Sequence, residues 1–242
     1  MCDCDEVAFA VATAGKFNND AMISGNVAAN EPGGWFRVSK DVFMADGTFI
    51  AADNVELGNA SSVFHVYANQ LKKGFDAVIR DGQSPITLPL QTPFCVAPTF
   101  TCGGPDVIVG PGEVLPPLTP GTYGRLIVRN GASLPLAYGT FTFCDVKMGR
   151  QAQIVAQGTV IMNIVGNLRV GTASFFGPDF GYAPIQAFVL GRKVRTSQSA
   201  VITAKIVAPN AKMTFGRDAA YNGCFCTAQA KSDKHITLTC VE

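Results

Sequence analysis

The sequence is poor in charge. Asp, Glu, Lys and Arg make up 15% of 242 residues, and the formal net charge is +1. So few charged residues leave little material for the solvated faces of amphipathic helices. A balanced charge also lacks the basic excess typical of nucleic-acid binding, so we expect no nucleic-acid partner. Lys and Arg are scattered, and the densest cluster, Arg192, Lys193 and Arg195, is interpreted as a solvated strand edge.

Long apolar runs and histidines are also scarce. No run approaches the 18 or more residues of a transmembrane segment, so we expect no membrane span. The two histidines, His65 and His235, stand in no metal-binding motif, and His65 fits an outward or locally bonded position on a strand. Neither a Gly-x-Ser-x-Gly elbow nor a phosphate-binding loop occurs. The sequence predicts no cofactor, no metal site and no catalytic residues, and the protein is expected not to be an enzyme.

Cysteine, by contrast, is abundant. The eight cysteines are Cys2, Cys4, Cys95, Cys102, Cys144, Cys224, Cys226 and Cys240. An even number of this size favours disulfides in an oxidising compartment, with metal binding and free thiols as alternatives. Cys95–Cys102, which would close a short Pro-rich loop, is the pair we expect first, and the other pairings stay open. The acidic start is unlike a signal peptide, so an extracellular or cell-surface location implies a leader that is not in this sequence.

A short period runs through the chain. Gly-Thr before an aromatic or β-branched residue occurs at Gly47, Gly121, Gly139 and Gly158, and the last three copies start 18 and 19 residues apart. Fragments with two apolar residues around a polar one also recur before glycine, as in Val146-Lys147-Met148-Gly149 and Leu168-Arg169-Val170-Gly171. Each fragment is typical of a short strand that ends at a turn. A fixed period of this length indicates stacked coils of an all-β solenoid.

These units divide a single domain, 1–242, into three parts. N-terminal coils occupy 15–82, a Pro-rich loop insertion 83–120, and C-terminal coils 121–242. Nine of the fourteen prolines lie in the insertion, and proline is excluded from the interior of sheets. We expect the insertion to be a flap along the side of the solenoid, with a binding lid as the alternative. The acidic start and the charged segment 231–234 are expected to cap the two ends.

The stretch Ile206-Val207-Ala208-Pro209-Asn210-Ala211, continuing to Gly216 and Ala219, carries a recognisable motif. It resembles the Ala-Pro-Asn-Ala repeat of an uncharacterised family of bacterial cell-surface and pilus-associated domains. Those domains share the Gly-Thr-Tyr/Phe motif, and their Val-x-Gly-Asn element is similar to Ile164-Val165-Gly166-Asn167. The resemblance implies a right-handed parallel β-helix on an exported protein. It implies no catalytic residues.

Together these observations predict an exported, non-catalytic structural or adhesive β-helix with a protein or glycan partner. The alternatives are a self-assembling filament subunit and a glycan-binding or polysaccharide-active β-helix. The first alternative follows from the unpaired strands at solenoid ends. For the second, the aromatic side chains that could stack on sugars include Trp35, and those expected to form a binding surface are Phe175, Phe176, Phe180 and Tyr182.

Overall fold

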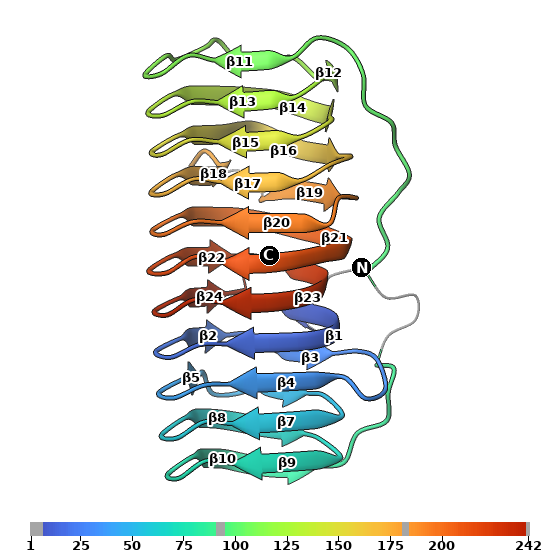
Figure 1. Ribbon diagram of the computed structural model, residues 1–242, viewed down its shortest axis with the longest axis vertical. Helices are drawn as coiled ribbons and strands as arrows, with labels where there is room; N and C mark the ends of the chain where they lie inside the picture. The colour runs from blue at the N-terminus through green and yellow to red at the C-terminus, as the bar shows by residue number, and fades with distance from the viewer. Residues whose placement is uncertain (1–6, 91–94, 181–183, 241–242) are drawn as a thin grey trace.

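The computed structural model describes residues 7–90, 95–180 and 184–240 and consists of short parallel strands (Figure 1). The strands wind into a β-solenoid of about 11 turns, which confirms the expected all-β parallel fold. At the usual strand spacing of about 4.8 Å, the rod is roughly 50 Å long. Within the described residues, no helix is long and apolar enough to cross a membrane.

The strands in chain order are β1 (Phe9–Phe17), β2 (Met22–Ser24), β3 (Val27–Ala29), β4 (Trp35–Val38), β5 (Phe43–Met44), β6 (Phe49–Ala51), β7 (Asn54–Leu57), β8 (Ser62–Tyr67), β9 (Gln70–Lys73), β10 (Val78–Ser84), β11 (Val107–Val109) and β12 (Gly121–Thr122). They continue with β13 (Leu126–Val128), β14 (Ser133–Phe143), β15 (Val146–Met148), β16 (Gln153–Ile164), β17 (Leu168–Val170), β18 (Phe175–Pro178), β19 (Ile185–Val189), β20 (Lys193–Thr196), β21 (Val201–Phe215), β22 (Ala220–Asn222), β23 (Phe225–Ser232) and β24 (Thr237–Thr239).

Each turn contributes a strand segment to three faces. Face 1 contains β11, β13, β15, β17, β20, the ends of β21, β23 and β1, then β4, β7 and β9. Face 2 begins with the start of β14 and includes β18, β22, β24 and β2, whereas face 3 includes β12, β19, β3 and β6. Alternate side chains point inward, so residues such as Val146 and Met148 join one continuous apolar core.

The turns do not stack in the order of the sequence. Strands β1 to β10 run from the middle of the rod to one end, and β11 to β24 run from the other end back to the middle (Figure 1). The last turn therefore pairs with the first, β23 with β1 and β24 with β2. The expectation that the charged segment 231–234 caps an end is wrong, because Lys231 pairs with Lys16 in the middle of the rod's length. The acidic residues before position 7 lie outside the described part.

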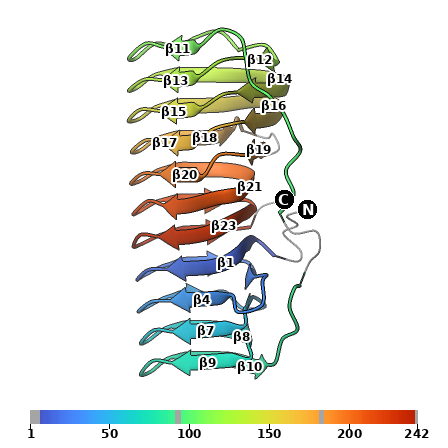
Figure 2. The same cartoon turned by 45° about the vertical axis from the view of Figure 1, so that its right-hand side comes forward.

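The Pro-rich segment is the connection between the two ends. Residues 85–90 and 95–106 lie along the side of the rod, between β10 at one end and β11 at the other (Figure 2). The strand-free segment is shorter than expected, since coils resume at Val107 and since Val114 and Leu118 already bridge to β14. The segment covers part of face 3, where Cys95 and Ala97 pack with Ala10, Val207 and Cys226.

Disulfides attach this connection to other turns. Cys95 is bonded to Cys226 and Cys102 to Cys144, with Cα atoms 5.6 and 5.0 Å apart. The expected Cys95–Cys102 pair is therefore wrong: the segment is extended along the rod, and each cysteine meets the turn it passes. Cys240 is disulfide-bonded as well, and buried Cys224 has its Sγ 4.0 Å from that of Cys240. Cys2 and Cys4 lie outside the described residues.

One corner repeats in every turn. Between faces 1 and 2 a residue adopts positive φ, for example Ala60 at 52° and Ala173 at 52°. The glycine that ends the preceding strand fragment has another role, because a Cβ at Gly171 would lie 1.9 Å from the carbonyl oxygen of Gly149. Glycine is thus needed there for close stacking of neighbouring turns, whereas the change of direction falls two residues later.

Candidate functional site

The outward residues of face 1 form a row of cations. The strands of this face show a buried–exposed–buried alternation, and their central outward residues are in register from turn to turn. In spatial order the cations are Lys147, Arg169, Arg195, Lys231, Lys16, Arg37 and Lys72, with Thr214 between Arg195 and Lys231 and Glu56 between Arg37 and Lys72. We call these seven residues the cation row. Lys193 and Lys212 pair with each other in the adjacent outward column.

Among the described residues, most cations of the row form no close ion pair. Arg37 and Lys72 both form ion pairs with Glu56, at 3.4 and 3.7 Å. In the part of the chain that the structure describes, the other five cations form no ion pair within 4.0 Å. Like charges on adjacent strands oppose folding, at a cost on the order of 0.5 kcal/mol per pair. The row therefore costs stability and does not add to it.

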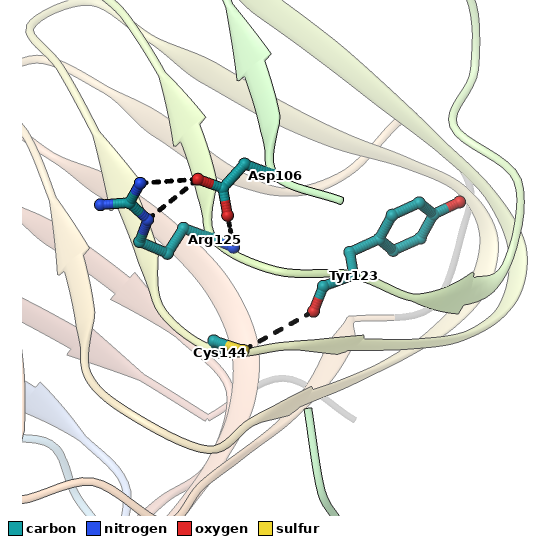
Figure 3. Close-up of polar contacts among 4 residues, drawn as sticks. All are labelled: Asp106, Tyr123, Arg125 and Cys144. Carbon is teal, nitrogen blue, oxygen red and sulfur yellow. Dashed lines mark hydrogen bonds and ion pairs between the residues drawn. The ribbon is translucent and has the colours of Figure 1, made fainter. Parts of the chain in front are cut away.

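The row ends at Ile127, which is paired with Lys147, and an ion pair lies beside it on the same turn in the adjacent column. The side chain of Arg125 donates to Asp106 through Nε and Nη2, at 3.0 and 2.6 Å, and its backbone N–H donates at 2.7 Å (Figure 3). The side-chain hydrogen bond from Arg125 holds the pKa of Asp106 below its usual range. In the next turn, the Sγ of Cys144, between β14 and β15, lies 3.9 Å from the carbonyl oxygen of Tyr123. The charge of Arg125 is thus compensated, and the open part of the row begins at Lys147.

Shallow pockets follow the row along the face. One of about 300 Å³ contains Lys147, Arg169 and Asn167, and another of about 270 Å³ contains Arg195, Lys231 and Asn18. Two more, of about 300 and 440 Å³, share Arg37, Glu56 and Lys72. Each pocket is open to solvent, so the face offers a ridged surface to a long ligand.

Positive charge is segregated on this face. The two outward columns of face 1 hold ten of the 19 Lys and Arg residues and three of the 18 Asp and Glu residues. The ten are Lys16, Arg37, Lys72, Arg125, Lys147, Arg169, Lys193, Arg195, Lys212 and Lys231. On face 2, the matching column from Ser133 to Val78 contains no charged residue. A chain of net charge +1 therefore presents one strongly basic surface.

Sequence reasoning missed this surface although its signal was present. The polar residue inside each apolar–polar–apolar fragment is Lys147, Arg169 or Arg195 in three successive turns. Stacked coils place equivalent positions in line, so these cations form a column. The interpretation of Arg192, Lys193 and Arg195 as a local solvated edge considered neighbours in sequence only.

The expected aromatic surface is not brought together. Phe176 is fully buried in the core, whereas Phe180 is fully exposed. Phe175 is half-buried on face 2, beside Val201 of the next turn. Tyr182 lies outside the described residues. Since Phe176 points inward, these side chains do not form one binding surface.

His65 has local partners on the last turn. Its Nδ1 lies 2.8 Å from Oδ2 of Asp81, and its Nε2 lies 3.3 Å from Oγ of Ser84. These two contacts resemble those of a Ser–His–Asp triad. However, none of the four pockets along face 1 adjoins the three residues. The contacts join β8 to the terminal strand β10. Within the described residues, no group of three or more His, Cys, Asp or Glu side chains is placed to hold a metal ion.

The fold and its open basic face define the protein as a parallel β-solenoid. No protein-family model matches the sequence, and no curated protein sequence matches it. Among solved structures, a similar one is the crystal structure of an ice binding protein from an Antarctic bacterium Flavobacteriaceae. The two chains are 12% identical, with a TM-score of 0.39 over 96% of this chain and 80% of that chain. No functional residue is transferred from that protein.

Proposed function

We propose that this protein is an exported, non-catalytic adhesive β-solenoid that binds a linear polyanion at a cell surface or in its surroundings. The observation that carries the proposal is the cation row, because five of its seven members form no ion pair within 4.0 Å with any residue that the structure describes. At about 4.8 Å per turn, the row from Lys147 to Lys72 extends over roughly 40 Å. An extended chain of repeated anions is complementary to such a row in both charge and shape.

Export is supported by the disulfides. Cys95–Cys226 and Cys102–Cys144 join parts of the chain that are distant in sequence, and such bonds persist mainly in oxidising compartments. They also hold the crossing segment against face 3, so the rod has two open faces. A rigid rod with one basic face is better suited to attachment than to catalysis. Thiol titration of native secreted protein tests this part, and eight reduced thiols would contradict it.

Binding is tested with the full chain on immobilised polyuronate and on heparin, eluted by a salt gradient. The test variant replaces Lys147, Arg169 and Arg195 by Gln. Its matched control replaces Arg129, Arg150 and Arg217 by Gln, so both variants lose three charges. These three arginines are exposed and lie at the corner between faces 1 and 2.

We expect the test variant to elute at much lower salt and the control to elute near wild type. Each lost contact to a densely charged polymer removes up to about 0.9 from the slope of log K against log salt. If the salt concentration at elution fell equally in the two variants, the effect would be one of net charge alone, and this result would contradict a binding face.

A further inference from the structure

Face 1 has a pocket beside the single tryptophan of the chain. Trp35 is 43% exposed, and it lines a cavity of about 300 Å³ on strands β4, β7 and β9. The other polar side chains of the cavity are Arg37, Asn54, Glu56, Gln70 and Lys72. An exposed tryptophan in a polar pocket suits a ligand that has both an apolar surface and hydrogen-bonding groups.

The strand register orders these side chains as a grid. Trp35, Asn54 and Gln70 follow one another across three turns in one outward column. Arg37, Glu56 and Lys72 occupy the adjacent column, two residues further along each strand. On the other side of Trp35 the neighbouring residue is Ala14, whose small side chain leaves the ring accessible. The grid therefore combines a flat aromatic, two amides and a central carboxylate between cations.

Glu56 distinguishes this pocket from the rest of the row, because it places a carboxylate among the cations. Its carboxylate forms ion pairs with Arg37 and Lys72, so the centre of the site carries hydrogen-bond acceptors and no donor. A phosphate placed at this position would meet like charge, which disfavours a nucleic-acid backbone. A hydroxyl group can donate to the carboxylate without that penalty.

We propose that this Trp35 pocket binds one sugar ring of a linear acidic glycan whose further carboxylates or sulfates lie along the cation row. The inference rests on the proposed function and names its ligand class. The C–H face of the ring packs on Trp35. Ring hydroxyls bond to Asn54, Gln70 and Glu56, and anions of adjacent sugars meet Arg37 and Lys16. The pocket thus supplies sugar recognition, and the row supplies affinity for charge.

Trp35 is itself the reporter for the test, because the chain contains no other tryptophan. The full-length protein is titrated with an oligouronate, a sulfated oligosaccharide, a neutral oligosaccharide of equal length and a single-stranded DNA of matched charge. Trp35 emission and calorimetric affinity are recorded together. We expect a saturable change in emission with an acidic oligosaccharide, and the uronate and sulfated ligands identify which anion is preferred.

Variants distinguish the contribution of the Trp35 pocket to glycan binding from that of the cation row. Trp35→Ala, followed by calorimetry, is expected to weaken glycan binding about tenfold or more. Asn54→Ala and Gln70→Ala retain the fluorophore and should weaken the ligand-induced emission change in the same way. Tyr138→Ala, a control at a side chain that is 72% exposed and away from the pocket, should bind like wild type.

Each contrary outcome has a distinct meaning. Glycan affinity that is unchanged in Trp35→Ala, together with no ligand-induced change in Trp35 emission of the wild-type protein, would overturn the pocket and leave the cation row in place. Equal affinity and an equal emission change with DNA would overturn the glycan class. If no polyanion binds the wild-type protein, the proposed function itself fails.

Discussion

Lys16 and Lys231 occupy directly paired positions on β1 and β23, although they come from opposite ends of the chain. They lie where the last turn meets the first, and Arg37 continues the row on the other side of Lys16. Three neighbouring cations at a junction that must close for the rod to form are unfavourable for folding. Their presence at this junction is better explained by binding than by stability.

Lys16→Glu should therefore have opposite effects on stability and binding. The new carboxylate would lie between Lys231 and Arg37, so the free energy of unfolding should rise by about 0.5–1 kcal/mol. Polyanion affinity should fall, because the row is interrupted at its middle. Urea unfolding and salt-gradient elution measure the two effects, with Arg217→Glu as the control of equal charge change. A variant that loses both stability and binding would contradict this role of the row.

The disulfide connectivity gives a second prediction. Proteolysis of the unreduced protein should release peptides linked through Cys95–Cys226 and Cys102–Cys144, which mass spectrometry identifies directly. Replacing Cys95 and Cys226 by Ser should lower the free energy of unfolding by about 2–4 kcal/mol. Among the described cysteines, Cys102 would then provide the remaining disulfide of the crossing segment. A Cys95–Cys102 peptide would be incompatible with an extended crossing.

The local structure could be predicted from the sequence, but the order of the turns could not. Fragments such as Leu168-Arg169-Val170 indicate a strand whose ends point inward, and β17 has that burial pattern. Such a fragment does not specify its neighbour, since the same inward–outward–inward pattern recurs in other turns. The pairing of β1 with β23 is decided by the length of the crossing segment and by long-range packing, for example Phe9 against Phe215, with ring centroids 5.4 Å apart.

The candidate site was also predictable only where it depends on local sequence. Lys147, Arg169 and Arg195 belong to successive turns, so their alignment follows from the period of the sequence. Lys231 follows in the same series through Thr214, whereas Lys16, Arg37 and Lys72 join the row only because the two ends of the chain meet. The Trp35 pocket needed the register of β4, β7 and β9, which no local pattern specifies.

The contacts of His65 allow a direct test of catalysis. A fluorophosphonate probe reacts with serines activated by a histidine base. We expect no labelling of Ser84, because the Asp81 side chain is 53% exposed and none of the four pockets adjoins the three residues. Intact-mass measurement after incubation with the probe decides the point. Labelling that disappears in His65→Ala would show a hydrolase-like site and would contradict the non-catalytic proposal.

A buried hydroxyl predicts how stability depends on alkaline pH. The backbone N–H of Gly216 donates to the Tyr221 hydroxyl at 2.7 Å, and Thr196 Oγ1 is its second partner. Burial raises the pKa of Tyr221 well above its usual value near 10. The folded state therefore favours the neutral phenol, whereas the unfolded chain ionises at about pH 10.

The contribution of Tyr221 to stability is thus constant below about pH 10 and is lost as the pH rises further, by up to about 1.4 kcal/mol per pH unit. Tyr221→Phe should cost about 1–2 kcal/mol at pH 8, because the core loses a hydrogen-bonding group. The variant should then lose less stability than wild type between pH 10 and 11.5. Urea unfolding of both proteins at several pH values measures this difference, and lysine titration is common to the two. Parallel curves across the range would show that Tyr221 ionises equally in the folded and unfolded states.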